Sequence, residues 1–242
     1  MNQSDIKIVP DFNPSIINPF YFVRTGLLKG IRKYALELNG VLLDFGCGSK
    51  PYLSLFKVDE YIGLDFENPG HPHINESIDV YYDGKNIPFG DNHFDSILCS
   101  EVVEHVFNLD DILKELNRVL KPGGKMLMTC PFAWNEHEVP NDFARYTKFA
   151  LIHKFEQNGF ELISYSKSGN FLSTVFQLLT LYFYERSAKR WYRIMPLRVL
   201  YKVFFYGFIN LMGLFFSNIL PKSESLYLNN IALFRKKTEN SY

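Results

Sequence analysis

The chain has 242 residues, of which 47% are apolar and 21% are charged. This composition supplies a packed core and excludes a disordered or collagen-like chain. The 26 basic and 26 acidic side chains cancel, so no nucleic-acid partner is expected. The balance hides a split, because residues 1–170 carry 16 basic and 23 acidic side chains whereas residues 171–242 carry 10 and 3. We therefore expect one acidic α/β domain with a basic, surface-seeking tail.

The cysteines and the first residues bear on the compartment. Cys47, Cys99 and Cys130 each lie in or beside an apolar run, where a free cysteine behaves as a small apolar side chain. So few cysteines predict a reducing compartment rather than a disulfide framework. The opening MNQSDIKIVPDFNP lacks the basic and apolar segments of a secretion signal. We expect a cytoplasmic protein.

In chain order, an N-terminal arm and helix come first, over residues 1–39. Apolar residues recur at helical spacing from Asn18 to Leu38, and Asn39-Gly40 ends that helix. Over residues 40–166 apolar runs alternate with helical segments, which predicts a mostly parallel sheet covered on both faces. The expected strands are Val41–Phe45, Tyr61–Leu64, Asp79–Tyr82, Phe94–Cys99, Lys125–Cys130 and Phe160–Tyr165, and the expected helices are Pro51–Phe56, Glu101–Phe107, Asp110–Leu120 and Thr147–Asn158.

Residues 167–225 form an aromatic and basic helical insertion before a final strand, Leu226–Phe234, within residues 226–242. Ser168–Tyr184 and Val203–Pro221 are uncharged, and the connector 185–202 carries six basic residues and one acidic residue. The second uncharged run is long enough to cross a bilayer, but crossing would place the basic connector outside the cell. We therefore expect peripheral contact with anionic lipid on the inner face of the cytoplasmic membrane. A helical cap over the acceptor pocket and a dimer surface are the alternatives.

The end of the first strand reads Asp44-Phe45-Gly46-Cys47-Gly48-Ser49-Lys50-Pro51. Its two glycines permit a tight turn and a close approach of the backbone to a ligand. A dinucleotide fingerprint requires a third glycine where this chain has Pro51. The second strand leads into Asp65, about twenty residues on, where a carboxylate can accept both hydroxyls of a ribose. The third strand leads into Asp83-Gly84.

The segments LLDFGCGSKPY, YIGLDF, DGKNIPF, HFDSILCSEVVEHV and RVLKPGGKMLMTCPF resemble, in order and spacing, the class I S-adenosylmethionine-dependent methyltransferases, and most closely their type 11 domain. The resemblance covers the core, residues 40–166. It implies an α/β fold with a seven-stranded, doubly wound, Rossmann-like sheet, an N-terminal helix, a helical insertion before the last strand, and S-adenosylmethionine as cofactor. The implied cofactor-binding residues are Asp44, Gly46, Cys47 and Gly48 for the methionine end, Asp65 for the ribose with Phe66 beside it, Asp83 and Gly84 for the adenine, and Ser100 beside the transferred methyl.

Candidates for removing a proton from an acceptor hydroxyl follow the fourth and fifth strands. We expect a metal-free base, with His137, His105 and Asp142 as catalytic candidates. A helix over residues 101–107 would place Glu101, Glu104 and His105 on one face. With His137 these resemble the Mg²⁺ site of quinone O-methyltransferases and small-RNA 2′-O-methyltransferases, so a metal site is the alternative. The loop after the fifth strand, which contains His137, also predicts an ion pair between Asp142 and Arg145.

The loop HEVPNDFARYT resembles loops of bacterial methyltransferases that act in glycan and secondary-product assembly. The expected reaction is O-methylation of a hydroxyl on a small-molecule or lipid-linked saccharide acceptor near the membrane. The second hypothesis is O- or C-methylation of a quinone-like or other small aromatic acceptor. A nicotinamide oxidoreductase and an inactive cofactor-binding protein are the alternatives of other classes, and the missing third glycine argues against the oxidoreductase.

Overall fold

The structure is a computed structural model that describes residues 12–66, 76–191 and 199–238, with side chains from 187 to 191 outside the description. The chain divides into two compact units. Unit 1 comprises Gly30–Ser166 with Asn230–Tyr242, and unit 2 comprises Val9–Lys29 with Lys167–Asn229. Much of the predicted arm and part of the basic connector, residues 192–198, lie outside the described residues.

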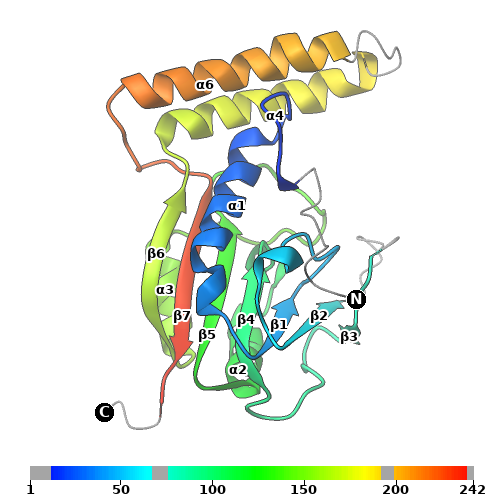
Figure 1. The fold of residues 1–242 in the computed structure, drawn as a ribbon, viewed down its shortest axis with the longest axis vertical. Helices are drawn as coiled ribbons and strands as arrows, with labels where there is room; N and C mark the ends of the chain where they lie inside the picture. The colour runs from blue at the N-terminus through cyan, green and yellow to red at the C-terminus, as the bar shows by residue number, and fades with distance from the viewer. Residues whose placement is uncertain (1–11, 67–75, 192–198, 239–242) are drawn as a thin grey trace. The chain divides into compact units, whose positions relative to one another are not determined.

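Unit 1 contains the seven-stranded sheet that the resemblance predicts (Figure 1). The order β3-β2-β1-β4-β5-β7-β6 is doubly wound, and the pairs from β3 to β5 are parallel. Figure 1 shows β7 running against its two neighbours, as expected for an inserted last strand. The strands are β1 Val41–Phe45, β2 Glu60–Phe66, β3 Val80–Tyr82, β4 Phe94–Ser100, β5 Leu120–Pro131, β6 Phe160–Ser168 and β7 Asn229–Lys236.

The core of unit 1 follows from apolar periodicity. Helix α2, Leu109–Val119, buries Ile112, Leu113 and Leu116, which recur at helical spacing on one face. Helix α3, Lys148–Gln157, begins where the Thr147 side chain accepts the Ala150 N–H at 3.3 Å. It buries Phe155, whose ring stacks on Phe234 of β7 at 4.2 Å between centroids. These helices cover the strands because each has one continuous apolar face.

Two predicted α-helices are wrong. The segment Pro51–Phe56 forms only the short 3₁₀ turn η4, Leu53–Leu55, and the segment Glu101–Phe107 forms only η5, Val103–His105. Glu101 has a φ of +56°, which an α-helix cannot accommodate, and its N–H donates to the Thr129 carbonyl at 2.9 Å. Glu101 therefore does not share a helix face with Glu104 and His105, which lie in η5.

The ends of several other elements differ from the prediction. Strand β5 begins at Leu120 rather than at Lys125, and β6 ends at Ser168 rather than at Tyr165. The N-terminal helix is shorter than expected, because α1 covers Tyr21–Tyr34 and the 3₁₀ turn η3, Ala35–Glu37, follows it. The last strand begins at Asn229 rather than at Leu226.

Unit 2 contains two long helices, α4 (Phe171–Trp191) and a helix over Val199–Ile219. The second helix consists of a first turn, the π-helical stretch η6 (Lys202–Gly207) and α6 (Phe208–Ile219). Val199–Ile219 is the one described helix that is long and apolar enough to cross a membrane by length and composition.

Buried amides of the two helices hold the chain at the start of α1. Gln177 accepts the N–H groups of Phe22 and Val23 at 3.0 and 3.2 Å and donates to the Pro19 carbonyl at 2.7 Å. Asn210 donates to two further main-chain carbonyls, at residues 16 and 18. The first turn of α1 carries no acidic residue, so Gln177 supplies the N-terminal cap from a distant helix.

Replacing Gln177 by leucine should destabilise the protein by about 2–4 kcal/mol, because it leaves buried N–H groups of α1 and the Pro19 carbonyl unpaired. Urea unfolding followed by circular dichroism measures the change. Gln157→Leu, at an exposed position of α3, is the matched control and should stay within about 0.5 kcal/mol of the wild type. Equal unfolding midpoints for the two variants would contradict the capping role.

Candidate active site

The loop after β1 is tied to the end of β2 by three backbone N–H groups. Those of Gly46 and Cys47 donate to the Leu64 carbonyl at 2.8 and 3.2 Å, and that of Gly48 donates to the Asp65 carboxylate at 2.7 Å. The other oxygen of Asp65 accepts the Phe66 N–H at 2.8 Å. A carboxylate oxygen has two lone pairs and can accept more than one donor, such as a backbone N–H and a ribose hydroxyl.

The two glycines of this loop serve different purposes. Both have positive φ, +72° at Gly46 and +45° at Gly48. A Cβ at Gly46 would lie 2.3 Å from the Val102 side chain, so that position is closed by packing. Among the described residues, a Cβ at Gly48 would meet the Glu76 carboxylate alone, at 3.8 Å, so these residues leave the backbone there open to a ligand. Sequence reasoning missed Glu76, which no recognisable motif marks.

Asp44, in β1, is a buried carboxyl group beneath this loop. Its partner is the Tyr61 hydroxyl, which donates to it. Burial is the main cause that raises the pKa of Asp44 to about 7; the hydrogen bond from Tyr61 opposes the shift and the negative charge of Asp65 adds to it. A cationic ligand group beside Asp44 would favour the carboxylate form.

Asp79 is a second residue that sequence reasoning missed. One of its oxygens accepts the Gly63 N–H and the Lys50 ammonium, each at 2.6 Å. Lys50 itself has a positive φ, of +52°. This ion pair fastens the glycine loop to the middle of β2, where the missing side chain of Gly63 leaves room for the Lys50 chain.

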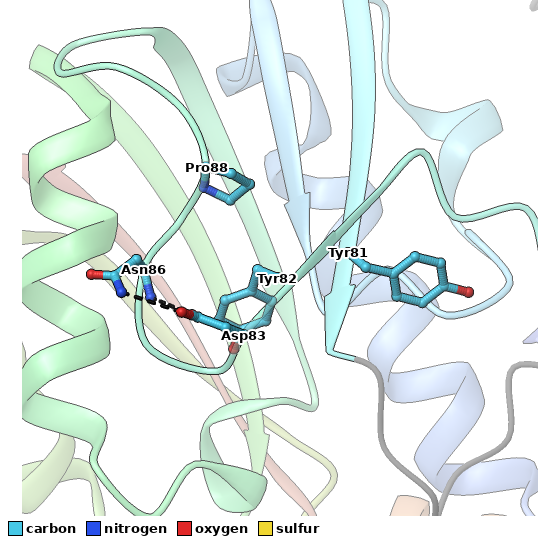
Figure 2. Close-up of a pocket in the computed structure, with 5 residues that line it drawn as sticks. All are labelled: Tyr81, Tyr82, Asp83, Asn86 and Pro88. Carbon is cyan, nitrogen blue, oxygen red and sulfur yellow. Dashed lines mark hydrogen bonds between the residues drawn. The ribbon is translucent and has the colours of Figure 1, made fainter.

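An open pocket lies at the end of β3 and the turn after it, where the adenine is expected (Figure 2). In Figure 2 the Asp83 carboxylate faces Asn86, and it accepts the N–H groups of Lys85 and Asn86 at 2.8 and 2.7 Å. These bonds hold the pKa of Asp83 below its usual value. Gly84 has a φ of +78°, and a Cβ there would lie 3.0 Å from the Phe66 ring. The pocket is lined by Tyr81, Tyr82, Asp83, Asn86 and Pro88.

At the end of β4, hydroxyl groups form a short hydrogen-bonded chain. The Ser100 and Thr129 hydroxyls are 3.0 Å apart, and Thr129 donates to a Glu101 oxygen at 2.8 Å. Ser100 is the last residue of β4, which lies beside β1 where the strand order of the sheet reverses. Ligands bind at this switch point in doubly wound sheets.

The two histidine candidates lie side by side, although 32 residues separate them. The rings of His105 and His137 meet edge to face, with centroids 4.7 Å apart. His105 Nδ1 is 2.7 Å from the Asn141 carbonyl, which can only accept, so Nδ1 carries the proton in the neutral ring. The lone pair of neutral His105 is therefore on Nε2, which lies 3.8 and 3.9 Å from carboxylate oxygens of Glu104 and Glu138.

Asp142, the third catalytic candidate, contacts both His137 and Arg145. Its carboxylate accepts the main-chain N–H of His137 at 2.9 Å and lies 3.3 Å from the ring nitrogen Nδ1 of His137. Arg145 donates to both Asp142 oxygens, at 2.6 and 2.7 Å, which confirms the predicted ion pair and lowers the pKa of Asp142 to about 2. The pKa of His137 is lowered by burial and by His105, so His137 is neutral at neutral pH.

Glu104 is fully buried, and neither of its carboxyl oxygens has a hydrogen-bond partner among the described residues. Burial, and then the negative charge of Glu101, raise its pKa well above the usual range. The carboxyl group is thus protonated unless a cation lies beside it. Its ligand atom and those of His105 and His137 lie within 4.8 Å of one another. Glu101, the fourth residue of the predicted metal set, is not part of this close group.

The methyltransferase domain family matches residues 43–128, which run from β1 to β5 and include the loop, the Asp65 and Asp83 turns and the β4 end described above. The chain belongs to the class I S-adenosylmethionine-dependent methyltransferases. It is therefore an S-adenosylmethionine-dependent methyltransferase, as the sequence motifs predict. The free, buried state of all three cysteines agrees with their predicted packing role.

Three relatives illustrate how far the similarity extends. An uncharacterized protein of Methanocaldococcus jannaschii is 31% identical over 72% of this methyltransferase and 75% of that protein. The ubiquinone/menaquinone biosynthesis C-methyltransferase UbiE of Shewanella oneidensis is 37% identical over 78 residues, 32% of this chain and only 31% of UbiE. The structure of Haemonchus contortus phosphoethanolamine N-methyltransferase 2 with S-adenosyl-L-methionine has a TM-score of 0.52 at 15% identity, over 93% of this chain and 58% of that one. That last likeness shows a shared fold alone.

Asp65→Ala should weaken S-adenosylmethionine binding by about 2–3 kcal/mol, the scale of a lost charge-assisted hydrogen-bond pair. Isothermal titration calorimetry measures the affinity, and Asp59→Ala, at an exposed position just before β2, is the control. An unchanged affinity would remove Asp65 from the cofactor site. Binding of NADH with comparable strength would favour the oxidoreductase alternative.

The raised pKa of Asp44 makes stability depend on pH in a defined direction. In the cofactor-free protein, the folded chain keeps a proton on Asp44 that the unfolded chain loses near pH 4. The wild type should therefore lose on the order of 4 kcal/mol relative to Asp44→Asn as the pH rises from about 4 to about 7. Urea unfolding of both proteins across this range tests the sign. Parallel curves would show that folding does not raise the pKa of Asp44.

Proposed function

We propose that this methyltransferase transfers the methyl group to a hydroxyl acceptor beside His105 and His137. The observation that carries the proposal is the pair of imidazole rings next to the β4 end, where the resemblance places the transferred methyl. The residues proposed for the cofactor are the eight of the loop and turns (Asp44, Gly46, Cys47, Gly48, Asp65, Phe66, Asp83 and Gly84) together with Ser100. They fit a nucleoside with a cationic ammonium end, because the carboxyl groups of Asp44 and Asp65 lie at the glycine loop and the backbone at Gly48 is open to a ligand.

Bound S-adenosylmethionine supplies an electrophilic methyl group on a sulfonium. The chain's own contribution is to position the acceptor, exclude water and accept the proton that the hydroxyl loses. His137 is the proposed base. Asp142 and Arg145 orient its ring, and His105 is the second candidate because its Nε2 lone pair is free to accept a proton.

For the acceptor we propose a glycan or lipid-linked saccharide at the inner face of the cytoplasmic membrane. Two observations support this choice: the polar, aromatic loop between β5 and α3 and the large exposed apolar area of unit 2. A saccharide hydroxyl has a high pKa, so its methylation requires a base such as His137.

A divalent cation is the alternative to a metal-free base, and the buried, unpaired Glu104 carboxyl favours it. Glu104, His105 and His137 would hold the ion, which would lower the pKa of an acceptor hydroxyl. Two imidazoles and one carboxylate suit Zn²⁺, Mn²⁺ or Fe²⁺ better than Mg²⁺, which prefers oxygen ligands. Glu101 does not complete the predicted four-residue set, because its carboxylate accepts from Thr129.

The second candidate function is O- or C-methylation of a quinone-like or other small aromatic acceptor. The match to UbiE favours it, although that match lies within the cofactor half of this chain and covers 31% of UbiE. Incubating cell extract with methyl-labelled S-adenosylmethionine and this enzyme, followed by mass spectrometry, distinguishes the two. A labelled saccharide supports the first function, and a labelled quinone or phenol supports the second.

His137→Ala should lower turnover by about 100-fold or more while the affinity for S-adenosylmethionine changes less than about twofold, because a base acts on the chemical step. His153→Ala, at an exposed position of α3, is the matched control. An unaltered turnover number would exclude His137 as the base. For the metal-free mechanism, EDTA should leave turnover unchanged. Inhibition that Mn²⁺, Zn²⁺ or Mg²⁺ reverses would establish the cation site instead.

A further inference from the structure

Helix α4 carries its polar residues on the inside and its apolar residues on the outside. The side chains of Thr174, Gln177 and Thr180 are fully buried. Within its uncharged part, Phe171–Tyr184, the exposed residues follow at helical spacing on the opposite side and are all large and apolar or aromatic: Phe171, Val175, Leu179 and Tyr182. A helix that faces water has the reverse arrangement.

The helix over Val199–Ile219 shows the same inversion. Asn210 is fully buried and Ser217 nearly so, whereas Phe204 and Phe208 are 67% and 59% exposed. The exposed row continues through Leu211, Phe215 and Ile219. We call the outward apolar residues of both helices the outer face. Single exposed apolar residues are ordinary on a protein surface, but rows of them on two helices mark an interaction site.

We propose that the outer face of unit 2 is a membrane-docking surface that inserts into the headgroup boundary of an anionic bilayer. This deepens the proposed function, on which it rests, by naming the surface that brings the enzyme to a lipid-linked acceptor. A lipid environment explains the inversion, because apolar side chains then face acyl chains while the polar ones bond inside the unit.

Lengths and buried bonds indicate that the helices lie in the interface and do not cross. The uncharged part of α4, Phe171–Tyr184, would extend about 21 Å as a helix, short of the roughly 30 Å hydrocarbon core. The inner side of the second helix is occupied, since Asn210 donates to the main-chain carbonyls of Ile16 and Asn18 in a non-helical segment. Irregular backbone of this kind is not tolerated against lipid in the bilayer core.

Charge distinguishes a lipid partner from a second copy of the chain. The connector 185–202 carries six basic residues and one acidic residue, and Arg186 and Lys222, near the ends of the helices, are exposed. Two copies meeting through these faces would bring like charges together, whereas anionic headgroups would neutralise them. The occupant that fits both the apolar rows and their basic flanks is an anionic membrane surface.

Flotation with vesicles of phosphatidylcholine alone, or with added phosphatidylglycerol, tests the proposal on the full-length protein. The wild type should float with the anionic vesicles. The double variant Phe204→Asp with Phe208→Asp should lower the bound fraction at least tenfold. Phe149→Asp is the matched control, because Phe149 is 80% exposed on α3 of unit 1, and it should bind as the wild type does.

A charge variant separates the electrostatic part from the apolar part. Arg186→Glu with Lys222→Glu should reduce the preference for anionic vesicles at least fivefold at low salt, and the difference should shrink at high salt. Calorimetry with S-adenosylmethionine on each variant shows that unit 1 is intact. If the wild type does not bind vesicles but still binds the cofactor and turns over a water-soluble acceptor, the docking proposal is wrong. The proposed methyltransferase function then still stands.

Two further outcomes would overturn the proposal. If the wild type binds neither vesicle type, and light scattering shows a dimer that the double variant Phe204→Asp with Phe208→Asp dissociates, the outer face is an interface between copies of the chain. If membrane-bound protein resists extraction with alkaline carbonate, the helices cross the bilayer.

Discussion

The register of the parallel strands is the constraint on which the site depends. Phe45 at the end of β1 pairs with Leu64 of β2 on one side and with Cys99 of β4 on the other. Because parallel strands in register end at the same edge, the glycine loop, the Asp65 turn and the Ser100 turn meet there. The hydrogen bond from Gly48 to Asp65 then joins two of these turns directly.

Several carboxyl groups also lie near this edge, and each has a different hydrogen-bond environment. Asp44 accepts a tyrosine hydroxyl, Asp142 forms a bidentate pair with Arg145, and Glu104 has neither kind of partner among the described residues. Their pKa values separate accordingly, with that of Asp142 lowered and those of the other two raised. Groups of different protonation state at one site are what proton transfer and the binding of a cationic cofactor require.

Unit 2 shows that burying polar groups can serve placement as well as stability. Gln177 and Asn210 use their buried amide groups to bond the main chain before and at the start of α1, and the Asn210 oxygen also accepts the Thr180 hydroxyl. The polar residues of the two helices are therefore committed inward, and their apolar residues are left outside. This inversion is consistent with the sequence, in which the two runs contain no charge.

Much of the fold and the cofactor motifs could be predicted from the sequence. Alternating apolar runs and helical periodicities are local patterns, so α2 and α3 are predicted to within one residue and all seven strands are predicted, although β5, β6 and β7 have ends three to five residues away from those expected. The order of the motifs sufficed for the family, and the Asp142–Arg145 pair followed from a spacing of three residues.

Only the tertiary structure decided the details that depend on distant contacts. The hydrogen bond to Thr129 and the positive φ of Glu101 turn an apparent helix into a 3₁₀ turn. The meeting of His105 with His137 depends on how the loop after β5 folds back on η5, and periodicity carries no information about that path. The sequence alone therefore determined which chemistry the chain carries, because those residues occur in local motifs. The structure decided which side chains act together, because that depends on contacts between segments far apart in the chain.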